Sequence, residues 1–105
     1  MKSILVLGAG RSCSTLIKHL LMRSEECEWR VVVGDIDLQV ARLKIDGHPR
    51  GEAFELSSTD NSERDKRIAE ADLVMSMVPP FLHAGVAKVA IQAGVSVITP
   101  SYLSD

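Results

Sequence analysis

The sequence predicts an α/β fold in which a doubly wound parallel sheet forms the middle of three layers. Apolar runs of strand length alternate along the chain with amphipathic stretches of helical length, as in parallel strands joined by helical crossovers. A glycine-containing turn between the first strand and the first helix is a second indication. Five strands joined by right-handed crossovers give the strand order 3-2-1-4-5. The 105 residues suffice for one domain.

The first strand and helix are defined by their apolar spacing. Residues 3–7 form a short, almost wholly apolar run, which is typical of a strand buried on both faces. Leu16, Ile17, Leu20 and Leu21 then repeat at helical spacing, which predicts a helix over residues 12–23. The acidic residues within 24–28 predict a solvated connector.

The next elements are shorter. Residues 31–33 are three consecutive valines and predict a strand that ends at Gly34-Asp35. Asp37 is placed to cap a short helix carrying Leu38, Ala41 and Leu43. Glycine and proline within residues 45–52 predict a loop, followed by a third strand at 53–56.

The remaining elements follow the same alternation. Asp60 and Glu63 have capping-box spacing and predict a helix that runs to about residue 70. The mixed charges of residues 62–67 suggest its solvated face. The last elements expected are a strand at 72–78 that is stopped by two prolines, a helix at 81–93 that is ended by Gly94, and a strand at 95–99.

The turn after the first strand, Gly8-Ala9-Gly10-Arg11-Ser12-Cys13, predicts a dinucleotide-binding site of Rossmann-like type. Gly8 permits the tight turn, and Gly10 leaves room for a pyrophosphate at the helix N-terminus. Arg11 either reaches a phosphate or is a solvated surface arginine. Cys13 stands where a third glycine is usual. Because its side chain is small, we expect a slightly displaced helix; the alternative for Cys13 is a reactive thiol.

A second candidate position follows the second strand. Asp35 has the spacing of the acid that binds the adenosine ribose, and Ile36 adjoins it. A carboxylate here would repel a 2′-phosphate, so Asp35 favours NAD, with NADP as the other cofactor considered. The alternative is that Asp35 caps the following helix and Asp37 serves the ribose.

Pro79 and Pro80 would form a rigid wall beside the nicotinamide half of the crevice, or merely stop the strand.

Composition narrows the class of protein. A net charge of −2 without a basic stripe argues against nucleic acid or an anionic membrane as partner. No apolar run approaches transmembrane length. The two cysteines make no disulfide framework and lack metal-ligand spacing, so we expect a cytoplasmic protein without a metal. His83 is the only histidine near the crevice. We expect it to cap or pack locally; the alternative is a general acid or base. No catalytic residue is therefore assigned.

Five segments along the chain carry a combined pattern: Gly8-Ala9-Gly10-Arg11, Val33-Gly34-Asp35-Ile36-Asp37, Ala71-Asp72-Leu73-Val74, Pro79-Pro80 with His83, and Ser101-Tyr102. Together they resemble the N-terminal domain of saccharopine dehydrogenases. The resemblance implies an NAD(P)-dependent oxidoreductase that transfers hydride at a C–N bond between an amino acid and a carbonyl carbon, in lysine metabolism or on a polyamine-type substrate. It also implies that Ser101 and Tyr102 lie on the substrate side.

The family's substrate domain would follow this region, so residues 1–105 are expected to be a dinucleotide-binding domain that is inactive alone. The unpaired edge of the fifth strand is expected to meet a partner, such as a second copy, or further residues of the chain. Two other hypotheses remain open. One is a nucleotide-sensing regulatory module without redox chemistry, and the other is a degenerate fold that serves assembly.

Overall fold

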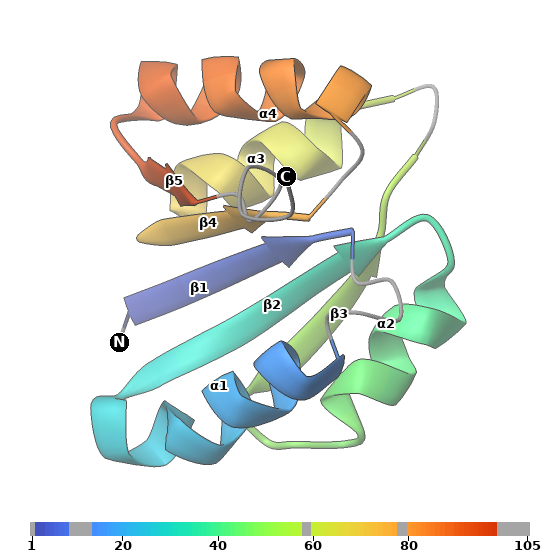
Figure 1. Ribbon diagram of the computed structural model, residues 1–105, viewed down its shortest axis with the longest axis vertical. Coiled ribbons are helices and arrows are strands. Elements are labelled where there is room, and N and C mark those ends of the chain that lie inside the picture. The colour runs from blue at the N-terminus through green and yellow to red at the C-terminus, as the bar shows by residue number, and fades with distance from the viewer. Residues whose placement is uncertain (1, 9–13, 58–59, 78–79, 99–105) are drawn as a thin grey trace.

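The computed structural model describes residues 2–8, 14–57, 60–77 and 80–98 (Figure 1). Strands and helices alternate strictly along this part of the chain. In order, the elements are β1 (Lys2–Leu7), α1 (Ser14–Cys27), β2 (Trp29–Asp35), α2 (Leu38–Ile45), β3 (Gly51–Glu55), α3 (Ser62–Glu70), β4 (Leu73–Ser76), α4 (Pro80–Ala93) and β5 (Ser96–Ile98).

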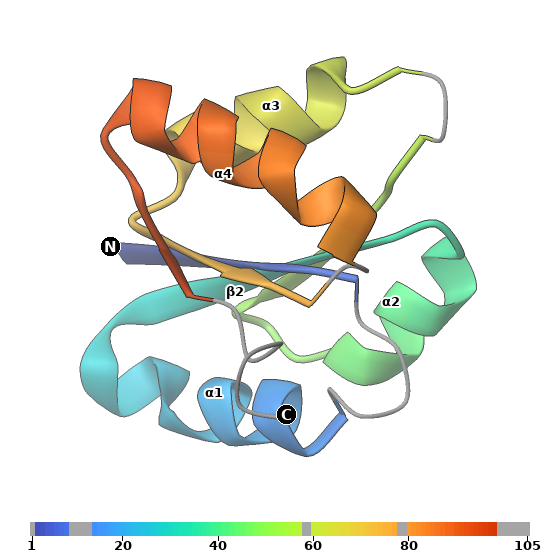
Figure 2. The same ribbon diagram turned by 45° about the horizontal axis from the view of Figure 1, so that its top comes forward.

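The strands form one parallel sheet in the order β3-β2-β1-β4-β5, which confirms the predicted topology. Helices α1 and α2 cover one face of the sheet, and α3 and α4 cover the other (Figures 1 and 2). The strand order reverses direction at β1, because the chain moves outward to β2 and β3 and then returns to β4 on the other side. This reversal is the position at which doubly wound sheets bind their ligands.

The central strand β1 is buried on both faces, as its apolar run predicted. Ile4 and Val6 belong to the core cluster beneath α1 and α2, whereas Leu5 and Leu7 belong to the cluster beneath α3 and α4. Successive side chains of a strand point to opposite faces, so one short segment supplies both hydrophobic cores.

The prediction that residues 24–28 form a solvated connector is wrong. Helix α1 continues to Cys27, and Ser24 is completely buried. The Ser24 hydroxyl donates a hydrogen bond to the Leu21 carbonyl at 2.6 Å, so the polar side chain is satisfied within the helix. The chain then turns at Glu28, which adopts a positive φ of 56°. The acidic neighbours are exposed, but they lie on a helix.

The predicted loop at residues 45–52 is also too long. Ile45 is the last residue of α2 and is buried, and β3 already begins at Gly51. A Cβ atom on Gly51 would lie 2.4 Å from Ile45 Cγ2, so this glycine lets the strand pack closely against the end of the helix. Leu43 is 75% exposed, however, and does not join the core.

The later elements follow the prediction with shifted ends. The capping box is not formed as predicted, because Asn61 is the N-cap of α3 and the Asp60 carboxylate accepts from the Ser62 amide at 2.9 Å. Strands β4 and β5 are shorter than expected within the described residues, and α4 begins one residue earlier, at Pro80. Gly94 has a positive φ of 73° just after α4, as a helix-ending glycine should.

Candidate functional site at the carboxyl ends of the strands

The carboxyl ends of β1 and β2 lie side by side at the predicted crevice. The two strands pair in parallel with Leu7 opposite Gly34, and the Gly8 amide donates to the Gly34 carbonyl at 2.8 Å. Gly8 has a φ of 78°, in the left-handed region that favours glycine. The backbone at the start of the glycine turn therefore has the conformation for which this residue was predicted.

Asp35 ends β2 next to this turn and is held by hydrogen bonds. Its Oδ1 atom accepts from the Asp37 amide at 2.9 Å, and its carbonyl accepts from the Leu56 amide at 2.8 Å. Asp37 is the N-cap of α2, with its own Oδ1 accepting from the Gln39 amide at 2.9 Å. The structure thus assigns the cap to Asp37, whereas the sequence had left open which of the two aspartates caps the helix.

Two further residues predicted to bind the cofactor, Ile36 and Pro80, lie at the same carboxyl edge of the sheet. Ile36 is 61% exposed and follows Asp35 directly. Pro80 is the first residue of α4. The Met77 amide donates to the Leu7 carbonyl at 2.8 Å, which brings the carboxyl end of β4 beside that of β1. The described parts of the glycine turn, the acidic corner and the start of α4 therefore converge on one edge of the sheet.

The other candidate residues lie outside the residues that the structure describes. They are Ala9, Gly10, Arg11, Ser12, Cys13, Pro79, Ser101 and Tyr102. Their roles, and the helix displacement expected from Cys13, remain predictions.

Other classes of site receive no support in the part of the chain that the structure describes. No group of three or more His, Cys, Asp and Glu side chains gathers there in a way that could hold a metal ion. No helix in these ranges has both the length and the apolarity needed to cross a bilayer.

An ion-pair chain on the α3 face was missed by the sequence analysis. Glu52 of β3 pairs with both Arg30 of β2 and Arg67 of α3, and Glu63 pairs with Arg67 at 3.2 Å. The guanidinium of Arg67 also lies over the Phe54 ring, 5.0 Å from its centroid. The sequence suggested only a solvated helix face here. The i,i+4 spacing of Glu63 and Arg67 could have predicted their pair. The pairs that Glu52 makes with Arg30 and Arg67 join residues far apart in the sequence, and no local spacing predicts them.

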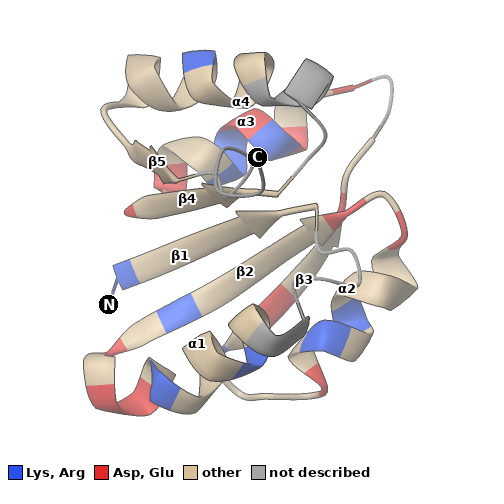
Figure 3. Ribbon diagram, in the orientation of Figure 1, with Lys and Arg blue, Asp and Glu red and all other residues tan. Residues whose placement is uncertain are grey.

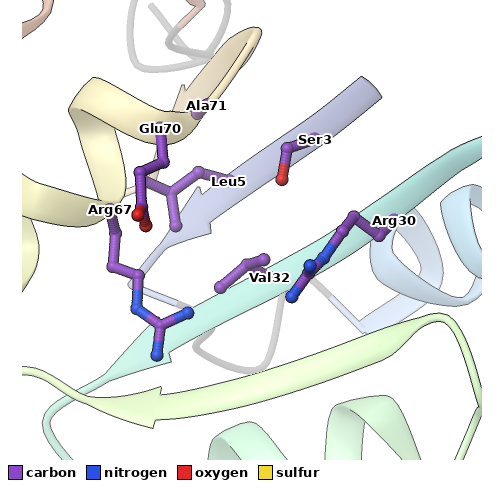
Figure 4. Close-up of a pocket in the computed structure, with 7 residues that line it drawn as sticks. All are labelled: Ser3, Leu5, Arg30, Val32, Arg67, Glu70 and Ala71. Atoms are coloured by element: carbon purple, nitrogen blue, oxygen red, sulfur yellow. The ribbon is translucent and has the colours of Figure 1, made fainter. Parts of the chain in front are cut away.

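These arginines border a cavity of about 290 Å³ at the amino side of the sheet. Figure 4 shows Arg30 and Arg67 extending from β2 and α3 on either side of Leu5 and Val32. Burial by itself would lower the pKa of Arg67, but its bonds and charge interactions with Glu52 and then Glu63 outweigh burial and raise the pKa. Because carboxylates already neutralise both arginines, this cavity is no ready anion site.

Two proteins of similar sequence and one solved structure match nearly the whole chain. The saccharopine dehydrogenase [NADP(+), L-glutamate-forming] of Schizosaccharomyces pombe is 35% identical over 104 residues, covering 99% of this chain and 22% of that protein. The alpha-aminoadipic semialdehyde synthase of Arabidopsis thaliana is 28% identical, covering 97% of this chain and 11% of that protein. The apo structure of the L-Glu-forming saccharopine dehydrogenase from Saccharomyces cerevisiae superposes with a TM-score of 0.81 at 30% identity, covering 94% of this chain and 21% of that one.

The fold is therefore that of a Rossmann-like, dinucleotide-binding class of domain. The family described as the saccharopine dehydrogenase NADP binding domain matches residues 4–105, and the chain belongs to that family. It spans about a fifth of the length of its fungal relatives and about a tenth of the plant one. The family description and the fungal relatives name NADP, rather than the NAD that Asp35 led us to expect.

Proposed function

We propose that this chain is the nicotinamide-cofactor-binding domain of a saccharopine dehydrogenase-like oxidoreductase. The single observation that carries the proposal is the convergence of Gly8 and Asp35 at adjacent strand ends, at the reversal of the sheet. The curated relatives are named as enzymes of the saccharopine and aminoadipic semialdehyde type. Their names favour an oxidoreductase over a nucleotide-sensing module.

The residues at this edge suit the two ends of an adenine dinucleotide. The positive φ of Gly8 allows the chain to turn toward α1, whose N-terminal amides would face the pyrophosphate. The segment from Gly8 to Cys13 would hold that group, and the Asp35 carboxylate would accept hydrogen bonds from the ribose hydroxyls. Ile36, being largely exposed, offers an apolar surface to the adenosine half. When bound, the cofactor supplies the hydride-accepting or hydride-donating carbon.

The charge of the ribose corner favours NAD over NADP. Asp35 and Asp37 place two carboxylates there, and the first turn of α2 contains no basic residue. The basic residues of this helix, Arg42 and Lys44, lie in its last turn. A 2′-phosphate would therefore meet like charge without a cation from this helix turn. We accordingly propose NAD as the preferred cofactor, although the relatives are named for NADP.

Binding of NADH and NADPH, followed by cofactor fluorescence, tests both parts of the proposal. We expect NADH to bind more tightly, and Asp35→Ala to weaken NADH by about tenfold, a loss typical of a hydrogen bond to a charged group. NADPH should lose less, because the same substitution removes a repulsive charge. Glu70→Ala is the matched control, since this exposed carboxylate at the end of α3 lies away from the site.

Each contrary outcome has a defined meaning. Failure of both cofactors to bind at roughly millimolar concentration would overturn the cofactor-binding role and favour a degenerate fold. Tighter binding of NADPH by the unaltered chain would overturn the NAD preference alone. Equal losses for both cofactors in Asp35→Ala would remove the ribose role of Asp35.

The chemistry of the whole protein is the second part of the proposal. Residues 1–105 would serve as the cofactor domain, and a separate substrate domain would complete a site for hydride transfer at a C–N bond of an amino-acid adduct. Ser101 and Tyr102 would then approach the substrate. The 105-residue chain should bind cofactor but turn over no saccharopine, and measurable turnover would contradict this division of labour.

A further inference from the structure

The outer face of α1 has a charge pattern that is unrelated to cofactor binding. Met22 lies at the centre of this face and is 71% exposed. Lys18 and His19 lie one turn before it, and Glu25 and Glu26 lie one turn after it, all exposed. At 100° per residue, all four lie within about 60° of the Met22 direction. Figure 3 shows the acidic residues gathered at the C-terminal end of this helix.

This pattern is self-complementary under a two-fold rotation. If a second α1 packs antiparallel with Met22 at the two-fold axis, Lys18 faces Glu25 of the second copy, and His19 faces Glu26 of the second copy. Each contact occurs twice, as in any isologous interface. A parallel arrangement would instead place like charges opposite one another. The sequence of charges therefore favours one partner, a second copy of this chain, and one orientation.

An apolar groove beside the helix supplies the centre of such an interface. The groove lies between α1 and α2, has a volume of about 540 Å³, and is lined in part by Met22, Leu43 and Lys18. Leu43 is 75% exposed, so two large apolar side chains border the groove. Burying them against their counterparts would remove apolar surface from water on both copies.

The charged residues of this face are also available for pairing between copies. None of the ion pairs found in the described ranges involves Lys18, Glu25 or Glu26. Met22 and the glutamates lie in the half of α1 that leads to the amino end of β2, away from Gly8 and Asp35. A partner on this face would leave the cofactor edge open.

We propose that the outer face of α1, with the groove beside α2, forms an antiparallel dimer interface with the same face of a second copy. The contacts are Met22 with Met22 of the second copy, flanked by the Lys18–Glu25 and His19–Glu26 pairs.

A charge-swap experiment tests the interface and its orientation together. Sedimentation equilibrium of the 105-residue chain should show a reversible dimer. Lys18→Glu alone and Glu25→Lys alone should each raise the dissociation constant about tenfold or more, because each homodimer then contains two repulsive contacts. An equimolar mixture of the two variants should restore dimerisation, since only the heterodimer has two opposite-charge pairs.

Lys66→Glu is the matched control, with the same change of charge on the exposed surface of α3, across the sheet. It should leave the dissociation constant within about twofold of the original. Circular dichroism should show that every variant is folded, as expected for exposed positions. A chain that stays monomeric at roughly millimolar concentration would overturn the proposal. An unaffected Lys18→Glu variant, an unrestored mixture, or an equal loss in Lys66→Glu would overturn it as well.

Discussion

Phe54 of β3 lies opposite Gly34 of β2, and its ring occupies the space that a side chain on Gly34 would need. The two residues pair in register, and a Cβ atom on Gly34 would lie 2.5 Å from Phe54 Cζ. Arg67 covers the ring at 5.0 Å from its centroid. Packing against Phe54 is therefore by itself a reason for a glycine immediately before Asp35.

Gly34→Ala should destabilise the domain by about 1–3 kcal/mol, the usual cost of overpacking a core. The added methyl group cannot be accommodated without moving Phe54, which is buried. Urea unfolding measures the change. Gly85→Ala, within α4, is the matched control, because a Cβ atom there would meet only the Arg64 side chain of α3, at 3.5 Å. That variant should be more stable by about 0.5–1 kcal/mol; equal destabilisation of both would contradict the packing explanation.

Arg67→Ala should cost about 1–2 kcal/mol, because it removes the cover over Phe54 as well as the pairs with Glu52 and Glu63. A double-mutant cycle with Glu52→Ala should give a coupling energy of about 0.5–1 kcal/mol that decreases with salt. Arg67→Met, which retains much of the packing, should recover part of the loss. No coupling between residues 52 and 67 would show that the ion pair contributes nothing to stability.

Asp37→Ala should cost about 1 kcal/mol, the typical contribution of an N-cap side chain. The Asp37 carboxylate accepts a hydrogen bond from the Gln39 amide at 2.9 Å. Removing the carboxylate leaves that amide without its capping partner. Asn61 is the N-cap of α3 but makes no side-chain cap bond, so Asn61→Ala should cost clearly less. Thermal unfolding of the two variants measures the difference. An equal cost at both positions would exclude the hydrogen bond as its cause.

Asp60 should contribute to acid sensitivity. Hydrogen bonds from the Ser62 side chain and then the Ser62 amide lower the pKa of the Asp60 carboxyl below its ordinary value of 3.8. A carboxyl whose pKa is lower in the folded chain than in the unfolded chain stabilises the fold at pH values above the unfolded-state pKa. This stabilisation is lost as the pH falls through the folded-state pKa. The stability difference between the unaltered chain and Asp60→Asn should therefore be constant above about pH 5 and shrink below about pH 4. Urea unfolding across this range measures it, and a pH-independent difference would contradict the assignment.

Much of the fold followed from local pattern. The apolar run at the start of the chain predicted a strand buried on both faces, and Ile4 and Leu5 do lie in separate cores. Alternation of strands and helices, with right-handed crossovers, was sufficient to predict the order β3-β2-β1-β4-β5. These features depend on residues close together in sequence, so the sequence alone determined them. Gly8 and Asp35 reach the same edge as a direct consequence of that order.

Contacts between distant residues were decided only by the tertiary structure. Ser24 was predicted to be solvated from its acidic neighbours, but α1 packs on the sheet and buries it. Arg67 was predicted to lie on a solvated face, yet it crosses to Glu52 and Phe54 because α3 lies above that part of the sheet. Local spacing fixes which residues share a helix or strand. Only the packing of one element against another fixes which polar side chains are buried and with which partners.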